Sequence, residues 1–184
     1  MIPNRSCILL MTALACHAWA AGAPACGEAP LIRAAWKVLP AELRFPCDPA
    51  HLVIIRDYEQ FLKAHPDLAA NAVLRERARH AFAFTITPAW PIYVNLGPHQ
   101  AIADAFNRSQ PWIAFAIAGV LAHERVHATG NLSEAAGLLA EFQLDQLFQS
   151  QRNLPPAFDL HELEQQYRSA LAQETTRPAE PPKP

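Results

Sequence analysis

One long apolar segment stands out in the pattern of hydrophobic and polar positions. Residues 111–122 carry no polar side chain, which predicts a buried helix that begins near Pro111 with Ser109 as its cap. The segment is shorter than the roughly 20 residues of a membrane-spanning helix. Gly130 is a typical helix terminator, and Ser133 is a good N-cap for a second helix over residues 134–150. The pattern therefore predicts two antiparallel helices joined by a short turn.

The remaining pattern predicts short strands before this hairpin. Residues 51–55 are a β-branched run, residues 82–87 alternate, and residues 91–96 form another short β segment. Helices are predicted over residues 29–39, 57–64, 67–80 (with Asp67 as cap), 99–107 and 156–173. The expected fold is α+β and mostly helical, with a small sheet of short strands that precedes the helix hairpin.

Composition and charge narrow the class of protein. The chain is 51% hydrophobic and 17% charged, so it can bury a core, and residues 21–174 have the length of a single domain. The formal net charge of −2 gives no basis for binding nucleic acid. Residues 175–184 are rich in proline, so we expect an extended, disordered tail there.

The N-terminal residues 1–20 have the features of a secretory signal peptide. Arg5 precedes an apolar stretch, and Ala18-Trp19-Ala20 forms an A-x-A cleavage site. We therefore expect an exported protein, periplasmic or secreted. The alternatives are a short membrane anchor or a hydrophobic first helix. A lipoprotein signal ending at Cys16 is a further alternative, and membrane association is expected only if Cys16 is lipidated.

The cysteines fit an exported chain. Cys7 and Cys16 lie in the signal region, which leaves Cys26 and Cys47 as a single pair. In an oxidising compartment this pair is expected to form a disulfide bond. A loop of about 20 residues closed in this way contributes about 3 kcal/mol to the free energy of unfolding.

The strongest chemical signal lies in the first helix of the hairpin. His123, Glu124 and His127 form an H-E-x-x-H motif, and residues four apart lie one turn apart on the same helix face. Both imidazoles can therefore reach one metal ion, with Glu124 directed toward a water at that metal. The alternative is a helix on which the two histidines are only solvated or capping.

A third metal ligand is expected from the second helix. Counting outward from the turn near residue 130, His127 lies opposite Glu134, which makes Glu134 the leading candidate. Glu141 is the rival, because it lies two turns further on the same face. The glutamate that does not bind metal, or Asp145, is expected to accept the N–H of a ligand histidine.

This segment resembles the zincin metallopeptidases and, among them, the gluzincins. The resemblance implies that His123 and His127 bind Zn²⁺ together with a glutamate of the following helix. It also implies that Glu124 is the general base. Glu141 and Asp145 match the E-x-x-x-D spacing of the family, but they follow the H-E-x-x-H motif more closely than is usual.

The resemblance covers residues 121–145 and also carries an expectation about the sheet. In zincins an edge strand beside the metal pairs with the extended substrate through unpaired backbone groups. Residues 92–96 are expected to be this strand. The alternative is a strand that only packs against the helices.

Three classes of function are consistent with these residues. The first is an exported zinc metallopeptidase that hydrolyses a peptide or protein substrate through a zinc-activated water, with Glu124 as general base. The second is a non-catalytic zinc-binding envelope protein. The third is a zinc amidase that acts on cell-wall peptides. The first is favoured over the second because a protein that only binds metal does not need Glu124.

Overall fold

The computed structural model describes residues 29–86, 89–97, 110–152 and 159–176 of the chain. This part of the chain is α+β and mostly helical, as the sequence pattern predicts. The elements, in chain order, are α2 (Pro30–Val38), η3 (Ala41–Leu43), β1 (Leu52–Ile55), α3 (Tyr58–Ala64), α4 (Pro66–Ala70), α5 (Ala72–His80), β2 (Ala83–Phe84), β3 (Ile92–Asn95), α7 (Gln110–Ala128), α8 (Glu134–Arg152) and α9 (Leu160–Thr176).

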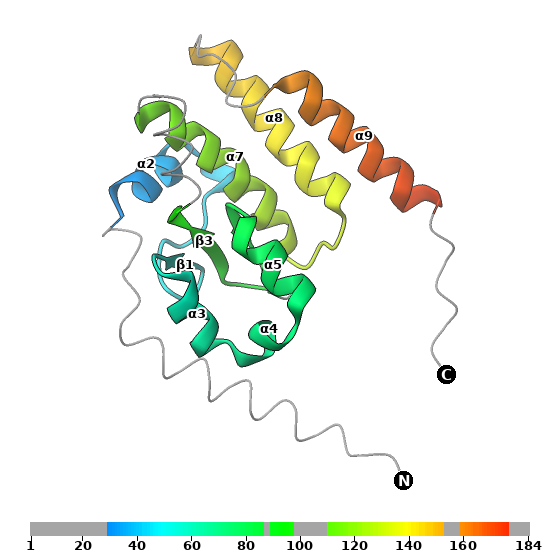
Figure 1. Ribbon diagram of the computed structural model, residues 1–184. Coiled ribbons are helices and arrows are strands. Elements are labelled where there is room, and N and C mark those ends of the chain that lie inside the picture. Colours follow the sequence, from blue (N-terminus) through cyan, green and yellow to red (C-terminus); the bar gives the residue numbers. More distant parts are fainter. Residues whose placement is uncertain (1–28, 87–88, 98–109, 153–158, 177–184) are drawn as a thin grey trace.

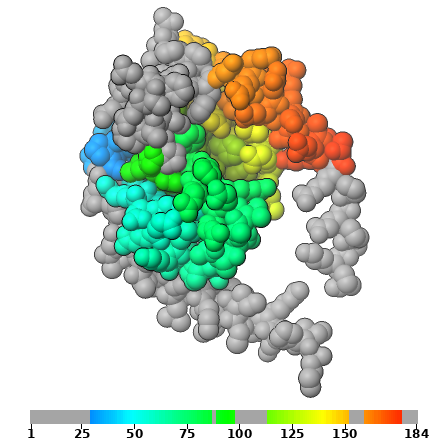
Figure 2. Space-filling model, in the orientation of Figure 1, coloured from blue at the N-terminus to red at the C-terminus, as the bar shows by residue number. Residues whose placement is uncertain are grey.

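Helix α7 is the centre of the fold. It packs against α2, against α8 and against the sheet, while α9 lies on the far side of α8 at the periphery of the molecule (Figures 1 and 2). Ile117, Ala118 and Leu121 of α7 are at most 1% exposed. A helix covered by neighbours on several sides can be apolar all round, which confirms the prediction of a buried helix. Among the described residues, no helix combines the length and apolar character that a membrane span requires.

The small sheet has helices on both faces. Ile92 and Val94 of β3 belong to the main core, which the sheet shares with α2, α7 and α8. Tyr93, between them, points to the opposite face and packs against a second core formed with α3, α4 and α5. This alternation follows from the two-residue period of a strand. One face of the sheet therefore supports α7, and α3–α5 cover the other face (Figure 1).

The strand order corrects one prediction. The order is β1-β3-β2, with β1 parallel and β2 antiparallel to β3. Residues 92–96 were expected to supply an edge strand, but β3 is the central strand and both its sides are paired. The edge strand on the other side of β3 from β1 is β2, which is much shorter than the predicted strand over residues 82–87. Chain order alone cannot show that β1 pairs with β3, because α3, α4, α5 and β2 lie between them in the chain.

The helical region before β2 also differs from the prediction. The single helix expected over residues 67–80 is two helices, α4 and α5, which meet at Asn71. Asn71 has an extended backbone, and its side chain accepts a hydrogen bond from the backbone N–H of Leu74 at 3.1 Å. It therefore acts as the cap of α5, whereas Asp67 lies in the first turn of α4.

The described residues test only part of the predictions for the two ends of the chain. Thr175 and Thr176 belong to α9, so these two residues are helical and not part of the extended tail that was predicted over residues 175–184. Cys47 is disulfide-bonded, while its predicted partner Cys26 lies outside the described residues. Outside them as well are the signal region with Cys16, the predicted helix over residues 99–107, and residues 177–184.

The turn between α7 and α8 forms as predicted. Gly130 has a φ of 96°, the left-handed conformation that favours glycine and ends a helix. Ser133 accepts a hydrogen bond from the backbone N–H of Ala136 at 3.0 Å through its hydroxyl, so it caps α8. The two helices consequently run back along each other (Figure 1).

Two glycines let α7 and α8 approach closely. A Cβ added at Gly137 of α8 would lie 2.7 Å from Nε2, 2.8 Å from Cδ2 and 3.0 Å from Cε1 of His123. These similar distances place it over the face of the ring, so the α8 backbone packs directly on the imidazole. Gly119 of α7 makes the reciprocal space, because its Cβ would lie 3.3 Å from Cγ of Glu141.

The variant Gly137→Ala is expected to lower the free energy of unfolding. In an unobstructed helix the change would stabilise the protein by about 0.5–1 kcal/mol. Here the added methyl group overlaps a buried ring, and overpacking costs about 1–3 kcal/mol, so the net effect is destabilising. Urea unfolding measures the difference. Gln146→Ala on the exposed side of α8 is the control, with an expected change within about 0.5 kcal/mol. A Gly137→Ala protein as stable as the wild type would contradict the close approach.

Candidate metal centre

His123 and His127 face each other from successive turns of α7. Their Nε2 atoms are 3.1 Å apart, and their ring centroids are 5.0 Å apart. The residue His123 is 8% exposed, and His127 is only partly buried at the end of the same helix. The two rings lie on the same face of α7, as the H-E-x-x-H spacing predicts. The burial of α7 holds the backbone from which both rings project.

The opposite nitrogen of each ring has a hydrogen-bond acceptor. Nδ1–H of His123 donates to Oε2 of Glu141 at 3.3 Å. Nδ1–H of His127 donates to the backbone carbonyl of Asn131 at 2.8 Å. A neutral imidazole has only one N–H, so this hydrogen bonding leaves a lone pair on each Nε2. In that form the two Nε2 atoms face each other across 3.1 Å, an arrangement that a shared proton or a bound metal ion would stabilise.

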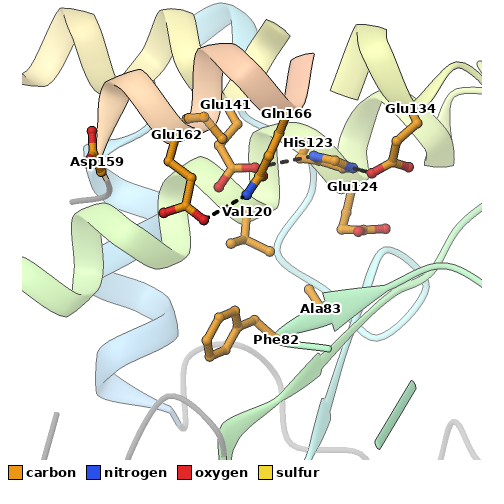
Figure 3. A pocket seen from close by; sticks show the side chains of 11 residues that line it. Phe82, Ala83, Val120, His123, Glu124, Glu134, Glu141, Asp159, Glu162 and Gln166 are labelled. Carbon is orange, nitrogen blue, oxygen red and sulfur yellow. Dashed lines mark hydrogen bonds and ion pairs between the residues drawn. The ribbon is translucent and has the colours of Figure 1, made fainter. Parts of the chain in front are cut away.

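Glu134 completes the cluster from the first turn of α8. Its Oε1 lies 3.5 Å from Nε2 of His123, and its Oε2 lies 3.5 Å from Nε2 of His127. One carboxylate therefore contacts both imidazoles through different oxygens (its contact with His123 is drawn in Figure 3). Within the described part of the chain, these three residues are the group whose donor atoms could hold one metal ion.

The electrostatics of the cluster favour positive charge. Burial opposes protonation of His123, but its contacts with Glu134 and Glu141 outweigh this effect and raise the pKa of His123 to about 10. Contact with Glu134 also raises the pKa of His127. Reciprocally, the two imidazoles hold the pKa of the Glu134 carboxyl far below its usual range. Protons or a metal ion can supply the positive charge that this arrangement attracts.

Glu124 stands beside the cluster as a buried carboxylate. It is 9% exposed and lines the same cavity as His123. Burial raises the pKa of Glu124, because the low-polarity surroundings disfavour its charged form. A carboxylate with a raised pKa is a better proton acceptor than an ordinary glutamate, which suits the predicted role of general base.

A cavity of about 360 Å³ lies beside His123, Glu124 and Glu134. Its walls come from α7 and α8, from the segment around β2, and from α9, and they are formed by Phe82, Ala83, Val120, His123, Glu124, Glu134, Glu141, Asp159, Glu162, Leu163 and Gln166 (Figure 3). The edge strand β2 therefore lies on the opposite side of the cavity from α9. The cavity is large enough for several atoms of a substrate beside the cluster.

The structure separates the two glutamates that the sequence left as alternatives. Glu134 contacts both Nε2 atoms, whereas Glu141 contacts Nδ1 of His123, the nitrogen that faces away from the cluster. Glu141 therefore makes the contact with His123 that was expected of the glutamate that does not bind metal or of Asp145. Asp145 is buried one turn further along α8, and its role stays a prediction.

Sequence reasoning missed several parts of this centre. Gly119 and Gly137 carried a usable signal, because glycine inside a helix is unfavourable and needs a packing reason. The carbonyl of Asn131 could be expected only in general terms, since the end of a helix leaves free acceptors. The wall contributed by α9 left no local signal, because it depends on how α9 packs against α8.

No protein-family model matches this chain, and neither a curated protein nor a solved structure is significantly similar to it. The resemblance to the zincins therefore remains a prediction that rests on the motif. The function is inferred from the chemistry of the residues that surround the cavity.

Proposed function

We propose that this protein is an exported zinc-dependent metallopeptidase, with His123, His127 and Glu134 as zinc ligands and Glu124 as general base. The observation that carries the proposal is the convergence of three donor groups. Their atoms lie 3.1 to 3.5 Å from one another while the second nitrogen of each ring is occupied elsewhere. The expected export rests on residues 1–20, and the proposed site of action is the periplasm or the cell exterior.

The donor set fits zinc in both chemistry and size. Zn²⁺ binds imidazole nitrogen and carboxylate oxygen at about 2.0–2.2 Å, usually in a tetrahedron. Two ligands of such a tetrahedron are about 3.3 Å apart, close to the separations between the three donors. Three protein ligands leave a fourth position for water or substrate, which is the pattern of a catalytic site rather than a closed structural site.

Zinc bound by this set would supply Lewis acidity, which would lower the pKa of a water molecule and polarise a substrate carbonyl. Glu124 then accepts the proton of the attacking water and delivers it to the leaving amine. Glu141 holds Nδ1–H of His123 and so keeps Nε2 directed at the cluster. The chain thus contributes binding, orientation and proton transfer in amide hydrolysis without a covalent enzyme intermediate.

Strand β2 supports a peptide as the substrate. Ala83 lines the cavity and pairs with Val94 of β3, so the other side of β2 is an edge of the sheet beside the candidate centre. An extended peptide can add to such an edge through backbone hydrogen bonds. We therefore propose for residues 83–84 the role that was expected of residues 92–96.

Two other functions remain alternatives to be tested. A non-catalytic zinc-binding envelope protein would bind the metal and release no product. A zinc amidase would cleave the peptides of the cell wall by the same chemistry. The buried position of Glu124 beside the proposed ligands favours a hydrolase over a protein that only binds metal, because burial raises the pKa of Glu124, which suits a general base and is not needed for metal binding.

The first test concerns the ligands. Purified protein is expected to bind one zinc per chain. Glu141→Ala removes the hydrogen-bond acceptor of His123 and should lower zinc affinity about 10–100-fold. Glu134→Ala removes a proposed ligand and should lower zinc affinity more than this. Competition with a chromophoric chelator measures both. Glu164→Ala on α9 is the control, because Glu164 pairs with Arg168 away from the cluster. A larger loss for Glu141→Ala would reverse the assignment, and a wild type that binds no zinc would refute the centre.

The second test concerns catalysis. Glu124→Gln keeps the size of the side chain but cannot accept the proton, so it should retain zinc and lose about 10²–10⁴-fold in turnover. Zinc-loaded wild type and variant are incubated with a peptide library, with cell-wall peptides and with envelope proteins. Mass spectrometry of new fragments identifies the product and separates peptidase from amidase. Equal activity in both proteins would exclude Glu124 as the base.

A further inference from the structure

Glu174, near the C-terminal end of α9, contacts the N-terminus of α8. The hydroxyl of Ser133 donates a hydrogen bond to Oε2 of Glu174 at 2.7 Å. The backbone N–H of Ala135 donates to Oε1 of Glu174 at 3.1 Å. The carboxylate therefore uses both oxygens, and its two donors are the residues immediately before and after Glu134.

The contacts of Glu174 extend into the first turn of α8. The Ser133 hydroxyl that donates to Glu174 also accepts the backbone N–H of Ala136 at 3.0 Å. The first N–H groups of a helix have no acceptor inside the helix. The oxygens of Glu174 and Ser133 accept two of these hydrogen bonds in α8 and so stabilise its first turn. A carboxylate at this position is also favoured by the positive end of the helix dipole.

The same network reaches the candidate ligand His127. The backbone N–H of Ser133 donates to Oδ1 of Asn131 at 2.9 Å, and the carbonyl of Asn131 accepts Nδ1–H of His127 at 2.8 Å. Glu174 is thus connected through Ser133 and Asn131 to the ring of His127. It also contacts the residues on either side of Glu134.

Glu134 needs such support more than the histidines do. Its side chain is 61% exposed, whereas those of His123 and His127 are 11% and 14% exposed. Packing therefore does not fix the Glu134 carboxylate, and its position depends on the backbone of the first turn of α8. An ordered first turn reduces the conformational freedom that zinc binding would otherwise remove.

We propose that Glu174 is a positioning residue for the metal centre: through Ser133 and Ala135 it holds the first turn of α8 so that Glu134 faces the two imidazoles. The inference rests on the proposed zinc centre and adds to it a contact from α9, 40 residues along the chain from Glu134. Glu174 itself touches neither metal nor substrate.

The test compares Glu174→Ala with wild-type protein of the full chain. Zinc affinity is expected to fall by about 10-fold or more, as it does when outer partners of metal ligands are removed. Glu174→Gln should lose less zinc affinity than Glu174→Ala, because the amide oxygen of the glutamine can still accept one of the two hydrogen bonds. Glu164→Ala removes the same charge from the same helix and should leave zinc affinity unchanged.

Cobalt provides a readout that a general loss of stability would not change. The visible absorption of the Co²⁺ protein reports the number and geometry of ligands, so displacement of Glu134 should alter it in Glu174→Ala and in Ser133→Ala. The double variant should show little additional effect, because both changes break the same network. If Glu174→Ala fails to fold, Ser133→Ala and Glu174→Gln decide the question by the same measurements.

The possible failures are distinct. A wild-type protein that binds neither zinc nor cobalt refutes the metal centre itself. A wild type that binds both, together with folded Glu174 and Ser133 variants of unchanged affinity and unchanged cobalt spectrum, overturns the role of Glu174 and leaves the centre intact.

Discussion

The candidate site depends most on the mutual approach of two imidazole nitrogens. Nε2 of His123 and Nε2 of His127 are 3.1 Å apart, and Glu141 and the Asn131 carbonyl occupy the other nitrogen of each ring. Two lone pairs at this distance repel each other unless a proton or a metal ion lies between them. The rest of the site can be understood as the means of holding this arrangement: a buried helix below the rings, a carboxylate opposite them, and hydrogen bonds that fix their orientation.

The helix hairpin turns a local motif into a site. Helix α7 is rigid because α2, α8 and the sheet all pack on it. Helix α8 brings Glu134 to the two rings, and its glycine backbone lies on the face of His123. Helix α9 forms one wall of the cavity and, through Glu174, also contacts the turn that precedes Glu134. Helix α9 therefore restricts the start of α8, and α8 restricts the position of His123 on α7.

Sequence reasoning succeeded where the information is local. The spacing of H-E-x-x-H, the φ of Gly130 and the capping by Ser133 depend on residues within one or two turns. It favoured Glu134 but left Glu141 as a rival, because both contact His123 and only the orientation of the ring distinguishes its two nitrogens. It also placed the edge strand wrongly, since the order of strands in a sheet is a long-range property. The break at Asn71 was missed because the capping side chain competes with a helix that propensity alone would continue.

The two interhelical glycines are part of a sequence pattern that can be searched for in other proteins. Gly119 precedes the motif by one helical turn, and Gly137 lies between the two glutamates of α8, so the close packing of backbone on side chain is encoded in a single stretch of 23 positions. Written as a pattern, it is G-x₃-H-E-x₂-H-x₆-E-x₂-G-x₃-E. Divergent chains that share this architecture should preserve small residues at the two glycine positions even where the rest of the sequence has drifted, because any larger group would push an imidazole or its supporting carboxylate out of place.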